Sequence, residues 1–278
     1  MNRKTKLALI ASLLPALAIA EAKPEAESMT VRAVAELGYL GVLSHVIQLD
    51  QDGTLIDYKA EGGQEVLFPV SRFSMELGLN ARHRLVFLYQ PLKIDTVNIL
   101  PRDLVISEAT YPAGTPVRFV YGFPFWRASW LYDFAPGPER ELSFGVSLQL
   151  RDATITFETL DGTILRNSRD VGPVPILKAR WRQPLSRSFW VGAEADGFYA
   201  PISYINGSDN EVVGAILDAS LRAGLELEGG ATLFLNLRYL GGGAVGQSEP
   251  DGPGDGYVKN WLHFLTVTLG ATYDLQVL

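Results

Sequence analysis

GAILDASLRAGLEL, residues 214–227, carries the clearest pattern in the chain. Every odd-numbered position from 215 to 227 is Ala or Leu, whereas Asp218, Ser220, Arg222 and Glu226 are polar and stand at even positions. Successive side chains of a β-strand point to opposite faces, so this stretch predicts a strand with one apolar and one polar face. It is about as long as a tilted strand that crosses a bilayer, and about twice as long as a typical strand of a globular protein.

The same period of two recurs along the chain, and no helical period of comparable quality accompanies it. The pattern predicts ten strands, at residues 31–49, 65–80, 83–91, 117–134, 140–157, 174–184, 188–200, 212–227, 231–241 and 261–275. The fold class is therefore all-β.

Short and long connections alternate strictly between these strands. Four short polar turns are expected, at 80–83, 135–139, 183–188 and 228–231, and five long loops, at 50–64, 92–116, 158–173, 201–211 and 242–260. Short turns at one end and long loops at the other are typical of a closed antiparallel up-and-down transmembrane β-barrel. Ten strands are expected, with eight to twelve as the range.

The N-terminus has the order of a secretory signal. Three basic residues precede the apolar run from Leu7 to Ala20, and small residues follow, which predicts cleavage after Ala20 or Ala22. We therefore expect a signal peptide at 1–20, a periplasmic segment at 21–30 and the barrel at 31–278. The apolar run is too short to span a membrane as a helix.

Composition narrows the function classes further. The 278 residues include no cysteine, so disulfides cannot hold the fold. The chain has 24 basic and 31 acidic residues, and loss of the signal removes three of the basic ones. A chain this acidic is not expected to bind nucleic acid.

Aromatic residues support a membrane location. Trp126, Trp130, Tyr132 and Phe134 share one face near a short turn, where a membrane interface would lie. The alternatives are a β-sandwich core, or a soluble periplasmic barrel that binds an apolar ligand and turns its apolar face inward. Both explain strands of membrane-spanning length poorly.

The closing strand TVTLGATYDL, residues 266–275, resembles the C-terminal signal by which the outer-membrane assembly machinery recognises its barrels. Thr268, Gly270, Tyr273 and Leu275 carry this resemblance. Residues 111–134 and 148–155 also resemble a pattern of uncharacterised bacterial outer-membrane barrels, which implies a fold and no activity. The resemblance implies outer-membrane lipid, including lipopolysaccharide, and the assembly machinery as partners, in the outer membrane of a Gram-negative cell; the oligomeric state stays open.

If the apolar face meets lipid, the polar face lines the lumen, and its charges nearly balance. We predict a lumen charge network of Arg72, Glu76, Arg127, Arg151, Lys178, Arg180, Arg182, Glu194, Asp196, Asp218, Arg222 and Arg238, with Arg32, Glu36, Asp133, Glu226 and Asp274 on the same face. Buried charges must be paired, so a packed interior is favoured over a conducting pore. Wide aqueous channels use about 16 to 18 strands.

Candidate chemistry is sparse. Ser44, His45 and His263 could serve acyl transfer at the rim, but Ser44 and His45 are neighbours on a strand and face opposite sides. No catalytic residue, cofactor or metal site is predicted, and 50–54 and 249–256 resemble calcium loops without the full ligand register. A structural, adhesive or narrow-pore transport role is favoured, and an outer-membrane hydrolase or lipid-modifying enzyme is the alternative.

The loop at 92–116 is less polar than a free loop should be. Val97, Ile99, Leu104 and Ile106 predict that two strands continue above the membrane as a hairpin around Pro101. Such a hairpin could cover the mouth of the barrel or meet a partner. The glycine-rich loop at 242–260 is expected to be exposed and mobile.

Overall fold

A computed structural model describes residues 29–137, 140–201, 211–248 and 254–276. The expected signal peptide at 1–20 and all but the last two residues of the periplasmic segment at 21–30 lie outside the described residues. No helix in the described part of the chain is long and apolar enough to span a membrane.

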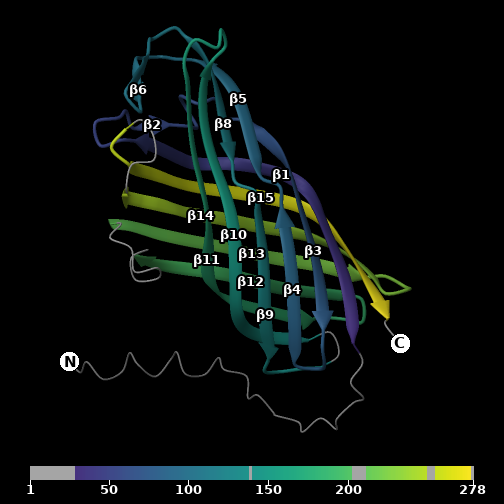
Figure 1. The fold of residues 1–278 in the computed structure, drawn as a ribbon. Helices are drawn as coiled ribbons and strands as arrows, with labels where there is room; N and C mark the ends of the chain where they lie inside the picture. Colours follow the sequence, from purple (N-terminus) through teal and green to yellow (C-terminus); the bar gives the residue numbers. More distant parts are fainter. Residues whose placement is uncertain (1–28, 138–139, 202–210, 249–253, 277–278) are drawn as a thin grey trace, which may run out of the picture.

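The chain forms a closed antiparallel barrel of long strands (Figure 1). The strands are β1 (Thr30–Leu49), β2 (Ile56–Asp57), β3 (Leu67–Gly78), β4 (His83–Gln90), β5 (Lys93–Ile99), β6 (Leu104–Ile106), β7 (Ala109–Tyr111), β8 (Pro116–Gly122), β9 (Phe125–Asp133), β10 (Glu141–Thr159), β11 (Leu165–Pro184), β12 (Phe189–Pro201), β13 (Glu211–Glu226), β14 (Ala231–Gln247) and β15 (Tyr257–Gln276). The ten wall strands are β1, β3, β4, β9 and β10 to β15, which confirms the predicted number. Closure comes from the pairing of β1 with β15, from Thr30 opposite Gln276 to Leu49 opposite Val258.

A proline ends the predicted strand at 83–91, and another interrupts the predicted strand at 117–134. Pro91 separates β4 from β5, and Pro124 separates β8 from β9. Proline has no N–H to donate to a strand ladder, so the pairing breaks there. Beyond these breaks β5 and β8 pair with each other, which confirms that the two strands continue as a hairpin. The expected turn at Pro101 is wrong, because Leu104 and Ile106 pair with β7 in a second small hairpin rather than with β5.

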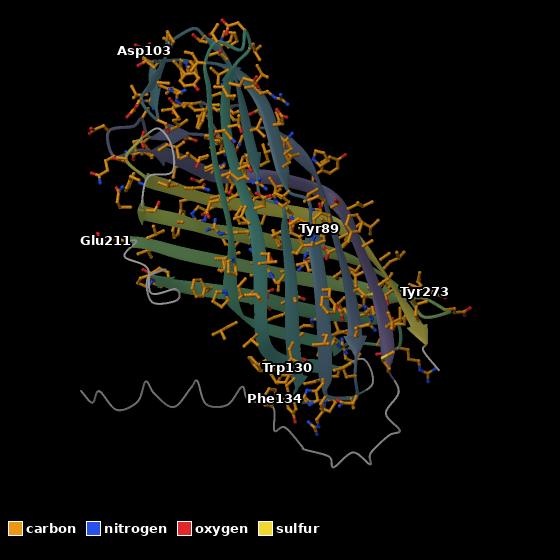
Figure 2. All side chains as sticks on the ribbon, in the orientation of Figure 1. Tyr89, Asp103, Trp130, Phe134, Glu211 and Tyr273 are labelled. Carbon is orange, nitrogen blue, oxygen red and sulfur yellow. The ribbon has the colours of Figure 1, made fainter. Side chains whose placement is uncertain are left out.

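The two ends of the barrel differ. Short turns join β3 to β4, β9 to β10, β11 to β12 and β13 to β14 at the end where β1 begins and β15 finishes. At the opposite end β5 and β8 project beyond the wall and carry the β6–β7 hairpin (Figure 1). Figure 2 shows Asp103 on this projection, far from Trp130 and Phe134 near the turn end. We call the two ends the turn end and the outer end.

Side chains alternate between lumen and exterior as predicted. On β13, Leu217, Leu221 and Leu225 are exposed outward while Asp218 and Ser220 are buried inside. The sequence of β4 is apolar on both faces, so it does not indicate which face is directed into the lumen. Burial does, because Val86 and Leu88 are buried and Phe87 is exposed. Apolar side chains on the outside of a sheet can face lipid tails, and the polar backbone is satisfied by closure.

Two expected loops are wrong. The stretch predicted as a loop at 158–173 is mostly strand, because β10 runs to Thr159 and β11 begins at Leu165. Likewise β14 runs to Gln247 and β15 begins at Tyr257, so most of the described part of 242–260 is a paired hairpin. Glycine has no side chain, so Gly241 to Gly243 show no alternation of polar and apolar residues, and the sequence pattern could not predict a strand there.

Candidate functional site: the interior of the barrel

Arg127 on β9 is the centre of the lumen charge network. Its Nη1 atom lies 2.9 Å from Asp196 Oδ2 and 3.1 Å from Asp218 Oδ2, and all three side chains are nearly fully buried. The same guanidinium donates to Gln149 Oε1 from Nε and Nη2. Arg238 on β14 forms a further two-bond pair with Asp218. One arginine therefore joins β9 and β10 to β12 and β13 across the lumen.

A second group surrounds Glu36 and Glu194. Lys178 Nζ lies 2.6 Å from Glu194 and 2.9 Å from Asp196, which connects this group to Arg127. Arg72 and Arg222 each bridge Glu36 to Glu194, at distances between 3.1 and 3.5 Å. Each buried carboxylate thus faces more than one cation, as burial of charge requires.

The network continues toward the turn end. Arg180 donates two hydrogen bonds to Glu76, at 2.9 and 3.0 Å, and Arg84 pairs with both Glu76 and Glu141. Below this level Arg182 pairs with Glu226 and its guanidinium lies 4.3 Å from the Trp190 ring centroid. Arg32 closes the β1–β15 seam with Asp274.

The structure brings almost all of the predicted lumen residues together. The members that lie in or next to the network are Arg72, Glu76, Arg127, Lys178, Arg180, Arg182, Glu194, Asp196, Asp218, Arg222 and Arg238. Arg151 is the exception, because it pairs with the exposed Asp170 nearer the outer end. Asp133 instead accepts backbone N–H groups of Ala135 and Leu142 at the adjacent turn.

Smaller apolar contacts close the lumen below the network. Val34, Trp190 and Phe234 form a buried cluster at the turn end. Beside them lies a cavity of about 50 Å³, lined by Arg32, Glu141 and Thr232 among others. A space of this size holds a few water molecules.

An apolar cluster fills the outer end of the barrel, and pattern reasoning did not find it. We call it the upper core; its buried members are Leu40, Val42, Ile47, Leu49, Ile56, Tyr58, Val70, Leu92, Ile94, Leu100, Leu104, Ile106, Tyr111, Val117, Phe119, Tyr121, Ile155, Phe157, Leu240, Leu262 and Phe264. The wall strands supply it with inward apolar residues above the charge network. The connection between β1 and β3 adds Ile56 and Tyr58, and the projection adds Leu104 and Tyr111. The signal that could have found it is the change from polar to apolar on the inward face of strands such as β15.

His45 lies inside the upper core, away from both candidate partners for acyl transfer. Its Nδ1 atom is 2.9 Å from Gln64 Oε1 and its Nε2 atom is 3.3 Å from Asn260 Oδ1. A register shift between Val42 and Ser44 leaves Ser44 exposed while His45 is buried. His263 bonds to the Tyr239 hydroxyl on the other face of the wall. The hypothesis that His45 and His263 approach each other is therefore wrong.

At the outer end, an exposed ion pair lowers the pKa of one carboxyl, and burial raises the pKa of two tyrosine hydroxyls. Arg102 donates two hydrogen bonds to Glu61 and holds the pKa of that carboxyl below its ordinary value. Burial raises the pKa of the Tyr58 hydroxyl well above 10, and it raises that of Tyr111 to about 12. Both phenols therefore stay neutral at physiological pH.

Aromatic residues on the outside form pairs at two levels. Tyr89 stacks on Trp126 with ring centroids 5.2 Å apart, and His83 stacks on Trp130 nearer the turn end. The expected aromatic face of Trp126, Trp130 and Phe134 is exposed. Rings of this kind are enriched where a membrane meets water.

The residues of the expected assembly signal occupy both faces of β15. Tyr273 and Leu275 are exposed outward, and Thr268 is buried inside, where its hydroxyl donates to Glu36. Gly270 also faces inward, because a Cβ there would meet the ring of Phe234 at 2.1 Å. Recognition by the assembly machinery stays a prediction.

The candidate calcium loops hold no metal-ligand cluster among the described residues. Asp50 Oδ1 accepts the backbone N–H of Asp255, so the two loops contact each other directly. Part of the second loop, 249–253, lies outside the described residues.

Comparison with known proteins gives a likeness in fold. No family model and no curated protein matches the chain. The outer-membrane protease OmpT of Escherichia coli is similar in structure, with a TM-score of 0.52 and 11% identity over 88% of this chain and 97% of that one. The transport unit of the E. coli autotransporter AIDA-I, at 10% identity over 93% and 94% of the two chains, has a TM-score of 0.40. Ail of Yersinia pestis, at 10% identity over 88% and 99%, has one of 0.36.

These findings define the class of the molecule. The chain has the fold of the bacterial outer-membrane β-barrels. The closed backbone and the apolar outer belt place it in the outer membrane, since a closed barrel is the form in which strands can span a bilayer.

Proposed function

We propose that the chain is a sealed outer-membrane barrel with a structural or adhesive role, and that its contact surface is the projection at the outer end. The carrying observation is that charged and apolar side chains fill the lumen at successive levels. The network around Arg127 spans the middle, and the upper core lies above it. An open pore would need a water-filled passage through both, and ten strands enclose little space for one.

The projection supports an external role. Its outward surface mixes ion pairs with exposed apolar side chains. Arg118 pairs with Asp95, while Val97 and Ile99 are 54% and 64% exposed. Beside the projection, Arg169 pairs with Asp152 across β10 and β11. Exposed apolar groups with charged neighbours are typical of surfaces that bind a partner. Lipopolysaccharide is a further proposed partner, because these groups stand just beyond the aromatic pair of Tyr89 and Trp126.

The experiment is planar-bilayer conductance of the refolded chain. A band that shifts on heating in a gel first verifies that the barrel is folded. We expect no steady channel current from the folded protein, because the network and the upper core block the lumen. Discrete, reproducible channels from that same band would contradict the proposal and favour narrow-pore transport.

A further inference from the structure

The barrel wall is incomplete at the outer end between β1 and β5. Strand β3 pairs with β1 only as far as Gly41, where Leu67 begins it, and β1 continues for eight residues more. On this side the remainder of β1 has, in the described part of the chain, only the two-residue β2 as a partner strand. Strand β5 pairs with β8 and with no second strand among the described residues. Residues 55–66, which we call the wall segment, occupy the space between β1 and β5; Figure 1 shows β2, part of this segment, beside the outer end of β1.

Side chains rather than a strand ladder hold the wall segment to β5. Thr96 Oγ1 donates to the carbonyl of Gly62, and Asn98 Nδ2 donates to that of Glu61. The pair of Arg102 with Glu61 adds an exposed contact. On the β1 side the Tyr58 N–H donates to the carbonyl of His45. The bonds to β5 are separate, and the ladder of β2 with β1 has only two residue pairs, so the segment can detach without unzipping a wall strand.

The inner side of the wall segment lies in the upper core. Tyr58 is fully buried, and its ring centroid is 4.9 Å from that of His45, 5.5 Å from Phe119 and 5.7 Å from Phe157. Ile56 and Gln64 are also buried there. If the segment moved outward, these side chains would leave an apolar space lined by aromatic rings.

Several polar atoms in this region have no hydrogen-bonding partner among the described residues. They are Tyr58 Oη and Gln64 Nε2 on the wall segment, and both Oε1 and Nε2 of Gln90 on β4, all on fully buried side chains. An unsatisfied buried polar group costs about 1 to 3 kcal/mol, so such groups are rare without a reason. If the wall segment moved outward, Tyr58 and Gln64 would reach solvent. A ligand with a hydrogen-bonding end could then bond to the polar groups that stay inside, such as those of Gln90.

The outside of the gap is apolar as well. Leu43 on β1 and Leu67 on β3 are 52% and 66% exposed, and Val97 on β5 is 54% exposed. These side chains border the wall segment from both sides. An apolar molecule can therefore stay in contact with apolar surface from the exterior to the upper core.

We propose that the wall segment is a lateral gate, and that the upper core behind it binds an apolar molecule with one hydrogen-bonding end, such as a long-chain alcohol. The segment swings outward, the apolar chain takes the place of Ile56 and Tyr58, and the polar end bonds to His45 Nδ1 in place of Gln64 Oε1. The charge network forms the floor of the site. The proposal leaves the barrel sealed to ions, so it stands apart from the proposed scaffold function.

A reversible lock tests the gate. The chain has no cysteine, and a Cβ at Gly63 would lie 3.7 Å from that of Thr96, within the range of disulfides. The double variant Gly63→Cys/Thr96→Cys is reconstituted in phosphatidylcholine liposomes with a long-chain alcohol that carries a photoreactive diazirine. After illumination, mass spectrometry maps the adducts. In the reduced variant and in the unaltered protein we expect adducts on Tyr121 and Phe264, which face inward, and the disulfide should lower them at least tenfold.

Adducts on the outward-facing Val267 and Leu269 serve as the internal control and should not change. Gly63 has a φ of +73°, so the single variant Gly63→Cys, tested for its heat-modifiable band, controls for strain. Equal inward labelling in the locked and reduced states would overturn the gate. Labelling confined to outward residues in the unaltered protein would overturn the site itself and would leave the conductance result unaffected.

Discussion

Arg127 carries the most consequential contacts of any single side chain in the lumen. Its replacement by Met would remove one of the two cations that face each of the buried Asp196 and Asp218, because Lys178 and Arg238 would be the only partners left to them among the described residues. Breaking a buried ion pair from one side costs about 3 to 5 kcal/mol. We expect Arg127→Met to lower the free energy of unfolding by about this amount, measured by urea titration in lipid vesicles.

Arg169→Met is the matched control for Arg127→Met. Arg169 also forms a two-bond pair, with Asp152, but its side chain is 61% exposed. Exposed pairs contribute at most about 1 kcal/mol. Equal losses in the two variants would show that water reaches the network, and would contradict the sealed interior.

The lumen charges were predictable because alternation assigns each strand residue to a face. Lys178, Glu194, Asp196 and Arg127 could all be placed inside from sequence. The contact of Arg127 with Asp196 could not, since contacts across a lumen depend on register and tilt. Tyr58 was beyond prediction for another reason. It stands in an irregular segment with no period, so nothing in the sequence indicates that it points inward.

Glycines decide how far the last hairpin of the wall extends. Gly242 on β14 has a φ of +129°, and a Cβ there would meet the carbonyl oxygen of Ala215 at 2.2 Å. Side chains rarely adopt this conformation, and such strain costs about 1 to 3 kcal/mol. Gly242→Ala should therefore lower the thermal midpoint of unfolding and expose the outer β14–β15 hairpin to protease.

Gly172→Ala provides the comparison on β11. A Cβ at Gly172 would meet nothing within 4 Å, and its φ is not in the left-handed region. This variant should keep the midpoint and the protease resistance of the unaltered protein. If Gly242→Ala behaves in the same way, the hairpin does not depend on close approach of the β13 backbone.

Strand number was easier to predict than strand length. The apolar belt forces alternation inside the membrane, so each spanning stretch shows it. Beyond the belt both faces of a strand are exposed to water or both are buried, so polar and apolar residues no longer alternate. Residues Leu165 to Val171 of β11 are an example, because all of them are at least partly exposed. Turn-forming residues such as Asp161 and Gly162 then suggested a long loop where a tight turn joins two long strands.

For the barrel as a whole, three layers of different chemistry are stacked inside one wall. An apolar cluster lies at the turn end, the charge network in the middle and the upper core at the outer end. The charged layer crosses the lumen and resists compression of the wall, while the upper core anchors the projection to the barrel. The outer surface of the wall is apolar as well. A membrane-spanning barrel needs such a surface, whereas a soluble barrel with the same interior would not.

Whether the barrel lies in a bilayer can be tested by placing an arginine at two different depths on its outer surface. Leu221 on β13 is 63% exposed, and its cross-strand partners Ala193 and Leu237 are apolar too, so it lies in the belt. Val171 on β11 is 61% exposed but stands opposite Asp152, above the belt. An arginine near the bilayer midplane costs about 2 to 4 kcal/mol, and one near the interface about 0 to 1.

Leu221→Arg should therefore lower the free energy of unfolding in lipid vesicles by about 2 to 4 kcal/mol, and Val171→Arg by less than about 1. Both positions are equally exposed, so the difference depends on what surrounds the barrel rather than on contacts within it. In a soluble barrel both arginines would meet water and both variants would be as stable as the unaltered protein. Equal free energies of unfolding for the two variants would therefore contradict a membrane-spanning barrel, because a surrounding lipid bilayer requires Leu221→Arg to be the less stable.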